Sequence, residues 1–164
     1  MPVSISAPSA TSGLDCRQKR APFSIAYDAR FCLQSSPLVA DGAKSETGAV
    51  RAGDRAQYFW IYPNFMINCY GGAMDTNLVR PLGIDRTEVL FDFYFADVSD
   101  ARRAHNRASI EVADRIQEED LAICASVQRG LGSRAYTSGR LSVRREAGEH
   151  LFHRLLHADL RQAL

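Results

Sequence analysis

QYFWIYPNFMINCY (57–70), MDTNLVRPLG (74–83) and RTEVLFDFYFAD (86–97) are the stretches that decide the fold. Aromatic and β-branched residues of the kind that favour strands are concentrated in all three. Gly71-Gly72 and the run from Pro81 to Asp85 separate them with residues typical of turns. The sequence therefore predicts three strands in a consecutive antiparallel meander.

The last of these segments shows which face of the sheet is buried. Side chains alternate along a strand, so Val89, Phe91, Phe93 and Phe95 share one face. Glu88, Leu90, Asp92 and Tyr94 share the other. Pro63 cannot donate a ladder hydrogen bond, so it is expected to mark a bulge or a sheet edge, with the strand restarting at Asn64.

Helical patterns follow the expected sheet. Ser99 and Asp100 are good N-cap residues, helix formers continue to Gln128, and Arg129-Gly130 is typical of a helix end. A short strand is expected near Arg140–Arg144, followed by a final helix from about Gly148 to Leu160, where leucines recur at helical spacing. The predicted fold class is α+β, an antiparallel sheet with long helices packed on one face.

Composition limits the domain count and the classes of partner. With 164 residues and 46% hydrophobic composition, the chain fits one domain, expected over residues 22–164. The Ser- and Ala-rich residues 1–21 are expected to be a disordered or divergent start. The net charge of +1 does not indicate binding to nucleic acid or to an anionic membrane. The four cysteines lack a C-x-x-C pair, so we expect reduced, mostly buried thiols rather than a zinc or iron–sulfur site.

A carboxylate interrupts the apolar stripe of the long helix. Steps of three and four residues join Ala113, Ile116, Asp120, Ile123 and Val127, which predicts that Asp120 faces inward. An inward carboxylate must be paired, hydrogen-bonded or bound to a metal. The pattern leaves two interpretations open, a buried Asp paired with arginine or a metal ligand of the two-histidine, one-carboxylate iron type.

Histidine partners for such a site are not obvious in the sequence. His153 and His157 have the i, i+4 spacing that can place two imidazoles on one metal. They lie, however, in an ordinary amphipathic helix, where half-exposed histidines are common. His105, within the charged run ARRAHNR, is expected on the surface.

Several uncommon motifs in fixed order resemble a known family. They are Tyr62-Pro63-Asn64-Phe65, Met74-Asp75-Thr76-Asn77, Glu119-Asp120 and Ser126-Val127-Gln128-Arg129-Gly130. From about Gly53 to Gly139 the chain resembles the C-terminal catalytic domain of Rieske-type ring-hydroxylating oxygenase α subunits, in particular the choline monooxygenases. The resemblance implies a helix-grip-like sheet and a mononuclear Fe(II) ligand at Asp120. It also implies a Rieske [2Fe-2S] cluster and two histidine ligands carried upstream, and neither of those motifs occurs in this chain.

The resemblance further implies a substrate, partners and a compartment. Oxidation of choline to betaine aldehyde hydrate with O2 and ferredoxin-derived electrons is the implied reaction, and this chain alone is expected to be inactive. Cations of this kind bind over aromatic faces, and Trp60 and Tyr62 are the predicted pair of substrate-binding rings. A ferredoxin or reductase and a homo-oligomer are the implied partners, in the chloroplast stroma of a plant or the cytoplasm of a bacterium. The alternatives are a non-catalytic ligand-binding or oligomerisation domain, a truncated product, or an oxygenase for another amine or aromatic substrate.

Overall fold

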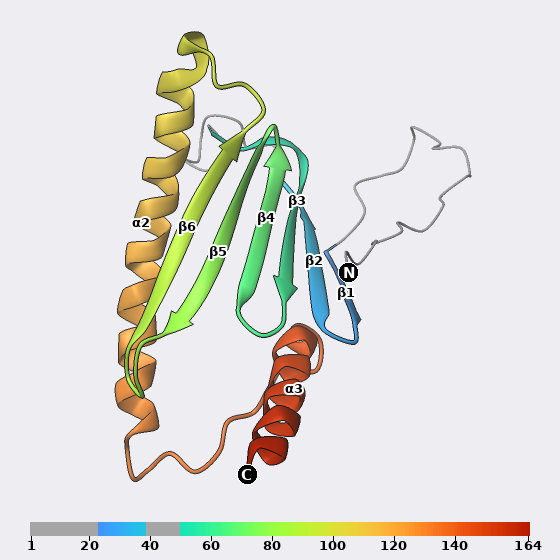
Figure 1. The fold of residues 1–164 in the computed structure, drawn as a ribbon, viewed down its shortest axis with the longest axis vertical. Coiled ribbons are helices and arrows are strands. Elements are labelled where there is room, and N and C mark those ends of the chain that lie inside the picture. The colour runs from blue at the N-terminus through green and yellow to red at the C-terminus, as the bar shows by residue number, and fades with distance from the viewer. Residues whose placement is uncertain (1–22, 39–49) are drawn as a thin grey trace, which may run out of the picture.

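A computed structural model describes residues 23–38 and 50–164 as a six-stranded antiparallel sheet with two helices (Figure 1). The expected disordered start at 1–21 lies outside the described residues. So does the run Asp41–Gly48, whose Gly- and Ser-containing sequence predicts a loop. Each strand pairs with the next along the chain, so the predicted meander is confirmed. The strands are β1 (Ser24–Asp28), β2 (Phe31–Pro37), β3 (Ala52–Ile61), β4 (Phe65–Gly71), β5 (Ala73–Pro81) and β6 (Thr87–Phe95).

The prediction of three strands between residues 57 and 97 is wrong, because four strands (β3 to β6) occupy this stretch. The segment from Gln57 to Tyr70 folds as a hairpin of β3 and β4, and the Tyr62-Pro63 bond at its tip is cis. Ile61 pairs with Phe65 across this turn. Proline therefore ends one strand completely, where the sequence suggested a bulge.

The strand register aligns side chains in rows across the sheet. One row joins Gln34, Tyr58, Asn68, Asp75 and Phe93, and the next joins Cys32, Trp60, Met66, Asn77 and Phe91. These rows share one face because their members differ by two residues along each strand. Phe91, Phe93 and Phe95 are partly buried, whereas Asp92 and Tyr94 on the opposite face are exposed, as the alternation in β6 predicts. At the start of the strand the prediction is wrong, because Val89 is exposed and Glu88 is partly buried.

Both helices cover the face that carries these rows. Helix α2 (Asp100–Leu131) runs beside β6, where the phenylalanine face is the more buried one, and its Val112 is buried. Helix α3 (Ala147–Ala163) contacts Cys32 and Trp60 of the same face. This arrangement confirms the α+β class with helices on one face. None of the described helices is long and apolar enough to cross a membrane.

Three local predictions need correction. Helix α2 continues to Leu131, three residues beyond the predicted Gln128, and Gly132 is its C-cap. No strand forms at Arg140–Arg144, because this segment has no strand to pair with and Val143 is almost fully exposed. Among the described cysteines, which are free thiols, Cys32 is buried and Cys69 partly so, but Cys124 is exposed.

Candidate functional site

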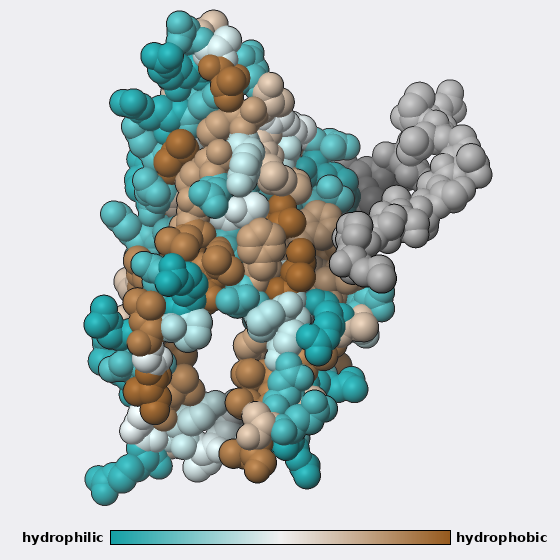
Figure 2. Space-filling model, in the orientation of Figure 1, coloured by the Kyte–Doolittle hydropathy of each residue, from teal (hydrophilic) through white to brown (hydrophobic). Residues whose placement is uncertain are grey.

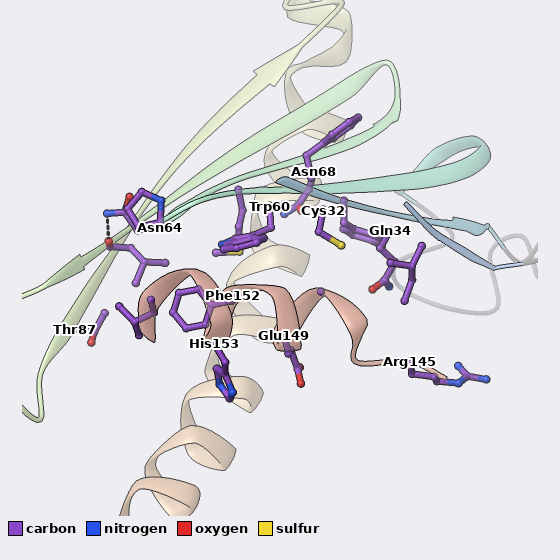
Figure 3. Close-up of a pocket in the computed structure, with 18 of the residues that line it drawn as sticks. Cys32, Gln34, Trp60, Asn64, Asn68, Thr87, Arg145, Glu149, Phe152 and His153 are labelled. Carbon is purple, nitrogen blue, oxygen red and sulfur yellow. Dashed lines mark hydrogen bonds between the residues drawn. The ribbon is translucent and has the colours of Figure 1, made fainter. Parts of the chain in front are cut away.

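A cavity of about 860 Å³ lies between the sheet and α3 (Figure 3). Its size falls within the range of small-molecule sites. The strands provide one wall, with Cys32, Gln34, Tyr58, Trp60, Met66 and Asn68 among its residues, and α3 provides the other, with Gly148, Phe152 and Leu156. The lining is therefore mainly aromatic and aliphatic, with a few polar groups from the strands.

Aromatic side chains form the centre of this cavity. The rings of Trp60 and Phe152 meet edge to face with centroids 5.6 Å apart. Farther along the same sheet face, the rings of Tyr58 and Tyr70 meet edge to face at 6.1 Å. Figure 3 shows Glu149 and His153 on the side of α3 that points away from the sheet, and Arg145 at one end of the site. The ring surfaces inside the cavity are therefore not covered by these charged or polar side chains.

The two predicted substrate-binding rings have different surroundings. Trp60 lines the cavity, whereas Tyr62 does not belong to its lining. The Tyr62 hydroxyl donates a hydrogen bond of 2.7 Å to Asp159, and the Arg30 guanidinium lies 5.1 Å from the centre of the Tyr62 ring. This hydrogen bond to a carboxylate raises the pKa of Tyr62. Tyr62 thus ties the end of α3 to the sheet and already has a cation over its ring.

Close packing at Gly148 sets the depth of the cavity at the start of α3. A Cβ atom at this position would lie 2.8 Å from the Cys32 sulfur. A side chain at position 148 would require the Cys32 thiol to rotate or α3 to move away from β2. Burial also raises the pKa of the Cys32 thiol, so this thiol is held as a small neutral packing group.

Gly148→Ala should destabilise the chain by about 1–3 kcal/mol, because the added methyl group overpacks the contact with Cys32. In a Cys32→Ala background the same change should cost no more than about 0.5 kcal/mol, since the sulfur is gone. Urea unfolding of the four proteins of this cycle measures the coupling. Equal costs in both backgrounds would show that the contact does not set the position of α3.

A hydrogen-bonded polar cluster lies beside the cavity on the same face. Asp75 and Asn77 of β5 are only 8% and 6% exposed. Asp75 Oδ2 accepts hydrogen bonds from the Asn68 amide at 2.7 Å and from the Asn77 amide at 2.9 Å. Asn68 belongs to the cavity lining. The sequence analysis did not single out this cluster; the signal that could have found it is Asp-x-Asn within an expected strand, because both residue types are uncommon in strands.

Asp120 lies in the C-terminal part of α2, where all residues from Glu118 to Leu131 are exposed. The structure corrects the prediction that it faces inward: Asp120 is exposed, and Ile123 and Val127 of the same stripe are 62% and 55% exposed. Only the first part of the stripe, including Ala113 and Ile116, is partly buried. Figure 2 shows open space between this part of α2 and α3, with hydrophobic residues on both sides. The carboxylate therefore stands on an apolar helix face that has no cover within the described residues.

Asp120 alone does not make an iron site. Within residues 23–38 and 50–164, no group of three or more histidine, cysteine, aspartate or glutamate side chains is placed to hold a metal. His150, His153 and His157 are exposed on α3, and His105 is partly buried on α2. Asp120 also has no ion pair in the described part of the chain, so the arginine-paired interpretation finds no support. The residues present do not fit a complete mononuclear iron centre.

Known proteins are similar to this chain in sequence. Residues 35–161 match the family model for the ring hydroxylating alpha subunit, catalytic domain. The chloroplastic choline monooxygenase of Arabidopsis thaliana is 47% identical over 71% of this chain, and that of Spinacia oleracea is 35% identical over 82%. These matches cover 27% and 31% of the relatives' own lengths, so the chain spans less than a third of each.

Solved structures show the same arrangement of sheet and helices. A quaternary ammonium Rieske monooxygenase, described in relation to carnitine oxidation by gut microbiota, superposes with a TM-score of 0.67 over 82% of this chain and 38% of its own. A second structure of such an enzyme, bound to an inhibitor, gives a TM-score of 0.63. At 24% and 23% identity these structures support the fold alone. With the family model matching most of its length, the chain belongs to the ring-hydroxylating oxygenase α subunits, within their catalytic domain.

Proposed function

We propose that this chain is the part of a Rieske-type non-haem iron oxygenase that contributes the carboxylate ligand of the iron and one wall of the substrate pocket. Its substrate is a quaternary ammonium compound, with choline as the first candidate. The observation that carries the proposal is the cavity between the sheet and α3, with Trp60, Phe152 and Tyr58 at its surface. Aromatic faces in a largely apolar cavity suit a cation that has no hydrogen-bond donors.

The metal part of the proposal rests on Asp120. The residue is exposed and unpaired within the described chain, and it stands on an apolar helix face. A carboxylate suits Fe(II) when two imidazoles complete the ligand set, and an iron bound there would supply oxygen activation. The described residues do not supply those imidazoles, so another polypeptide segment must bring them. The isolated chain is accordingly expected to be inactive.

The wider assembly follows from the same proposal. In a complete subunit, a Rieske [2Fe-2S] cluster would supply the iron with electrons from a ferredoxin or reductase. The overall reaction would convert choline, O2, two electrons and two protons into betaine aldehyde hydrate and water. Homo-oligomerisation belongs to this proposal as well. The curated relatives are named chloroplastic, so the chloroplast stroma is the proposed compartment.

The fluorescence of Trp60 provides a direct test of the proposal that the cavity binds a quaternary ammonium compound. Trp60 is the only tryptophan of the chain and lines the cavity, so its fluorescence reports on occupancy. Titration with choline chloride should change the emission saturably, whereas NaCl at equal concentration should leave it unchanged. A response to choline no larger than the response to NaCl, with no heat of binding in calorimetry, would contradict the proposal.

A further inference from the structure

We infer that Asp75 gives the cavity its preference for a cationic ligand over a neutral ligand of the same shape. This inference rests on the proposed function, because it concerns the same cavity and the same class of ligand. Asp75 is a positioning residue here, since the cavity wall beside it is formed by Asn68. The juxtaposition of a buried carboxylate and an aromatic cavity carries the argument.

The carboxylate of Asp75 lacks a countercharge. It is 8% exposed and accepts its hydrogen bonds from the neutral amides of Asn68 and Asn77. No ion pair involves Asp75 within the described ranges of the chain. A carboxylate buried without a cation is unfavourable, so a ligand that brings a positive charge close to it gains electrostatic energy.

The strand register brings this carboxylate next to the cavity. Asp75 pairs with Asn68, and Asn68 pairs with Tyr58, all in one row on the face that α3 covers. Tyr58 and Asn68 both line the cavity. Directly paired residues lie about 5 Å apart, so Asp75 lies one strand to the side of Asn68, on the same face of the sheet. Across this short, largely apolar distance its negative potential is only weakly screened.

The geometry suits a quaternary ammonium group in particular. Such a group has no N–H to donate, so its attraction to a carboxylate is coulombic and does not require a direct hydrogen bond. It gains from aromatic faces in contact and from a negative charge beside them. Trp60 and Tyr58 provide the faces, and the Asn68 amide, which also lies 3.2 Å from Asn77 Oδ1, keeps the Asp75 oxygen from projecting into the cavity.

Glu149 and Arg145 are the charged residues of the cavity lining, but neither explains the preference. Figure 3 shows the Glu149 side chain on the outer side of α3 and the Arg145 side chain at the periphery. Arg145 also lies 5.5 Å from the centre of the Phe23 ring. Asp75 is therefore the carboxylate that the sheet itself holds toward the site.

The test compares choline with 3,3-dimethylbutan-1-ol, its neutral carbon isostere, by calorimetry and Trp60 fluorescence. The wild-type chain should bind choline about tenfold more tightly than the isostere or better, as expected for a weakly screened charge at this separation. Asp75→Asn should remove most of this preference while leaving the affinity for the isostere unchanged. If Asp75 had only a structural role, Asp75→Asn would instead weaken the binding of both ligands to the same extent.

Asp92→Asn is the matched control. Asp92 lies on the next strand and on the opposite, exposed face, so its removal changes the net charge equally without touching the cavity. It should keep the wild-type preference. The ratio of the affinities for choline and the isostere can be measured on the wild-type chain alone, so this part of the test does not depend on whether a variant folds. A wild-type ratio near one would overturn the inference. An unchanged ratio in a folded Asp75→Asn protein would overturn it as well. Failure of both ligands to bind would overturn the proposed function itself, whereas equal binding overturns only the role of Asp75.

Discussion

Asp120→Ala should abolish iron binding in a complete subunit while leaving the stability of this chain nearly unchanged. A chimera provides the complete subunit: residues 35–161 replace the matching segment of the Arabidopsis thaliana relative, which is 47% identical. Loss of one of three protein ligands should reduce iron affinity by about a hundredfold or more, since even outer-sphere changes cost 10–100-fold. Iron analysis after anaerobic Fe(II) loading measures the effect.

The stability half of this prediction follows from exposure. Asp120 is exposed and makes no ion pair within the described residues, so Asp120→Ala should change the free energy of unfolding of the isolated chain by less than about 0.5 kcal/mol. A buried arginine-paired aspartate would instead cost about 3–5 kcal/mol. Glu119→Ala is the matched control, because it removes the same charge from another side of the helix. Glu119→Ala should retain iron, and equal loss in both variants would rule out a specific ligand role for Asp120.

Gly71→Ala should give the largest loss of stability of any single methyl group added to the sheet. A Cβ atom there would lie 2.7 Å from the Ala52 carbonyl oxygen and 2.9 Å from the Gly53 nitrogen. Both are backbone atoms at the irregular pairing of β3 with β4, so no side-chain rotation can relieve the contact. Overpacking against backbone should cost about 2–4 kcal/mol, a large share of a typical domain's stability.

Gly83→Ala provides the comparison for Gly71→Ala. An added Cβ atom at Gly83 meets no atom within 4 Å, so its effect should stay within about 0.5 kcal/mol. Thermal and urea unfolding of the two variants measure the difference. If Gly71→Ala were as stable as Gly83→Ala, the close approach of β3 and β4 at this corner would not exist in solution.

Local patterns in the sequence predicted most of the sheet, because alternation and turn residues act over short distances. The phenylalanine face of β6 and the turns at Gly71-Gly72 and Pro81 were visible in this way. The hairpin at Pro63 was missed because its turn is very short, and a proline in an apolar stretch is equally typical of a bulge or a sheet edge. The expected strand at 140–144 failed for the opposite reason, since alternation there has no neighbouring strand to pair with.

The site was harder to predict, because it depends on which elements meet. Trp60 was found from its aromatic strand, but the contacts of Tyr62 with Arg30 and Asp159 join residues far apart in the chain. Periodicity placed Asp120 on the apolar stripe of α2, yet it could not show that this part of the stripe is exposed. Asp75 was visible only as a member of a family motif, and its burial follows from the pairing of four strands.

Product formation by the chimera with choline tests the central claim most directly. Supplied with reductant and iron, it should oxidise choline to the aldehyde level within about tenfold of the rate of the parent enzyme, because this chain is proposed to supply a working carboxylate ligand and substrate wall. Asp120→Ala should remove this activity. A folded chimera that binds iron but does not oxidise choline would contradict the proposal that this chain forms a choline pocket.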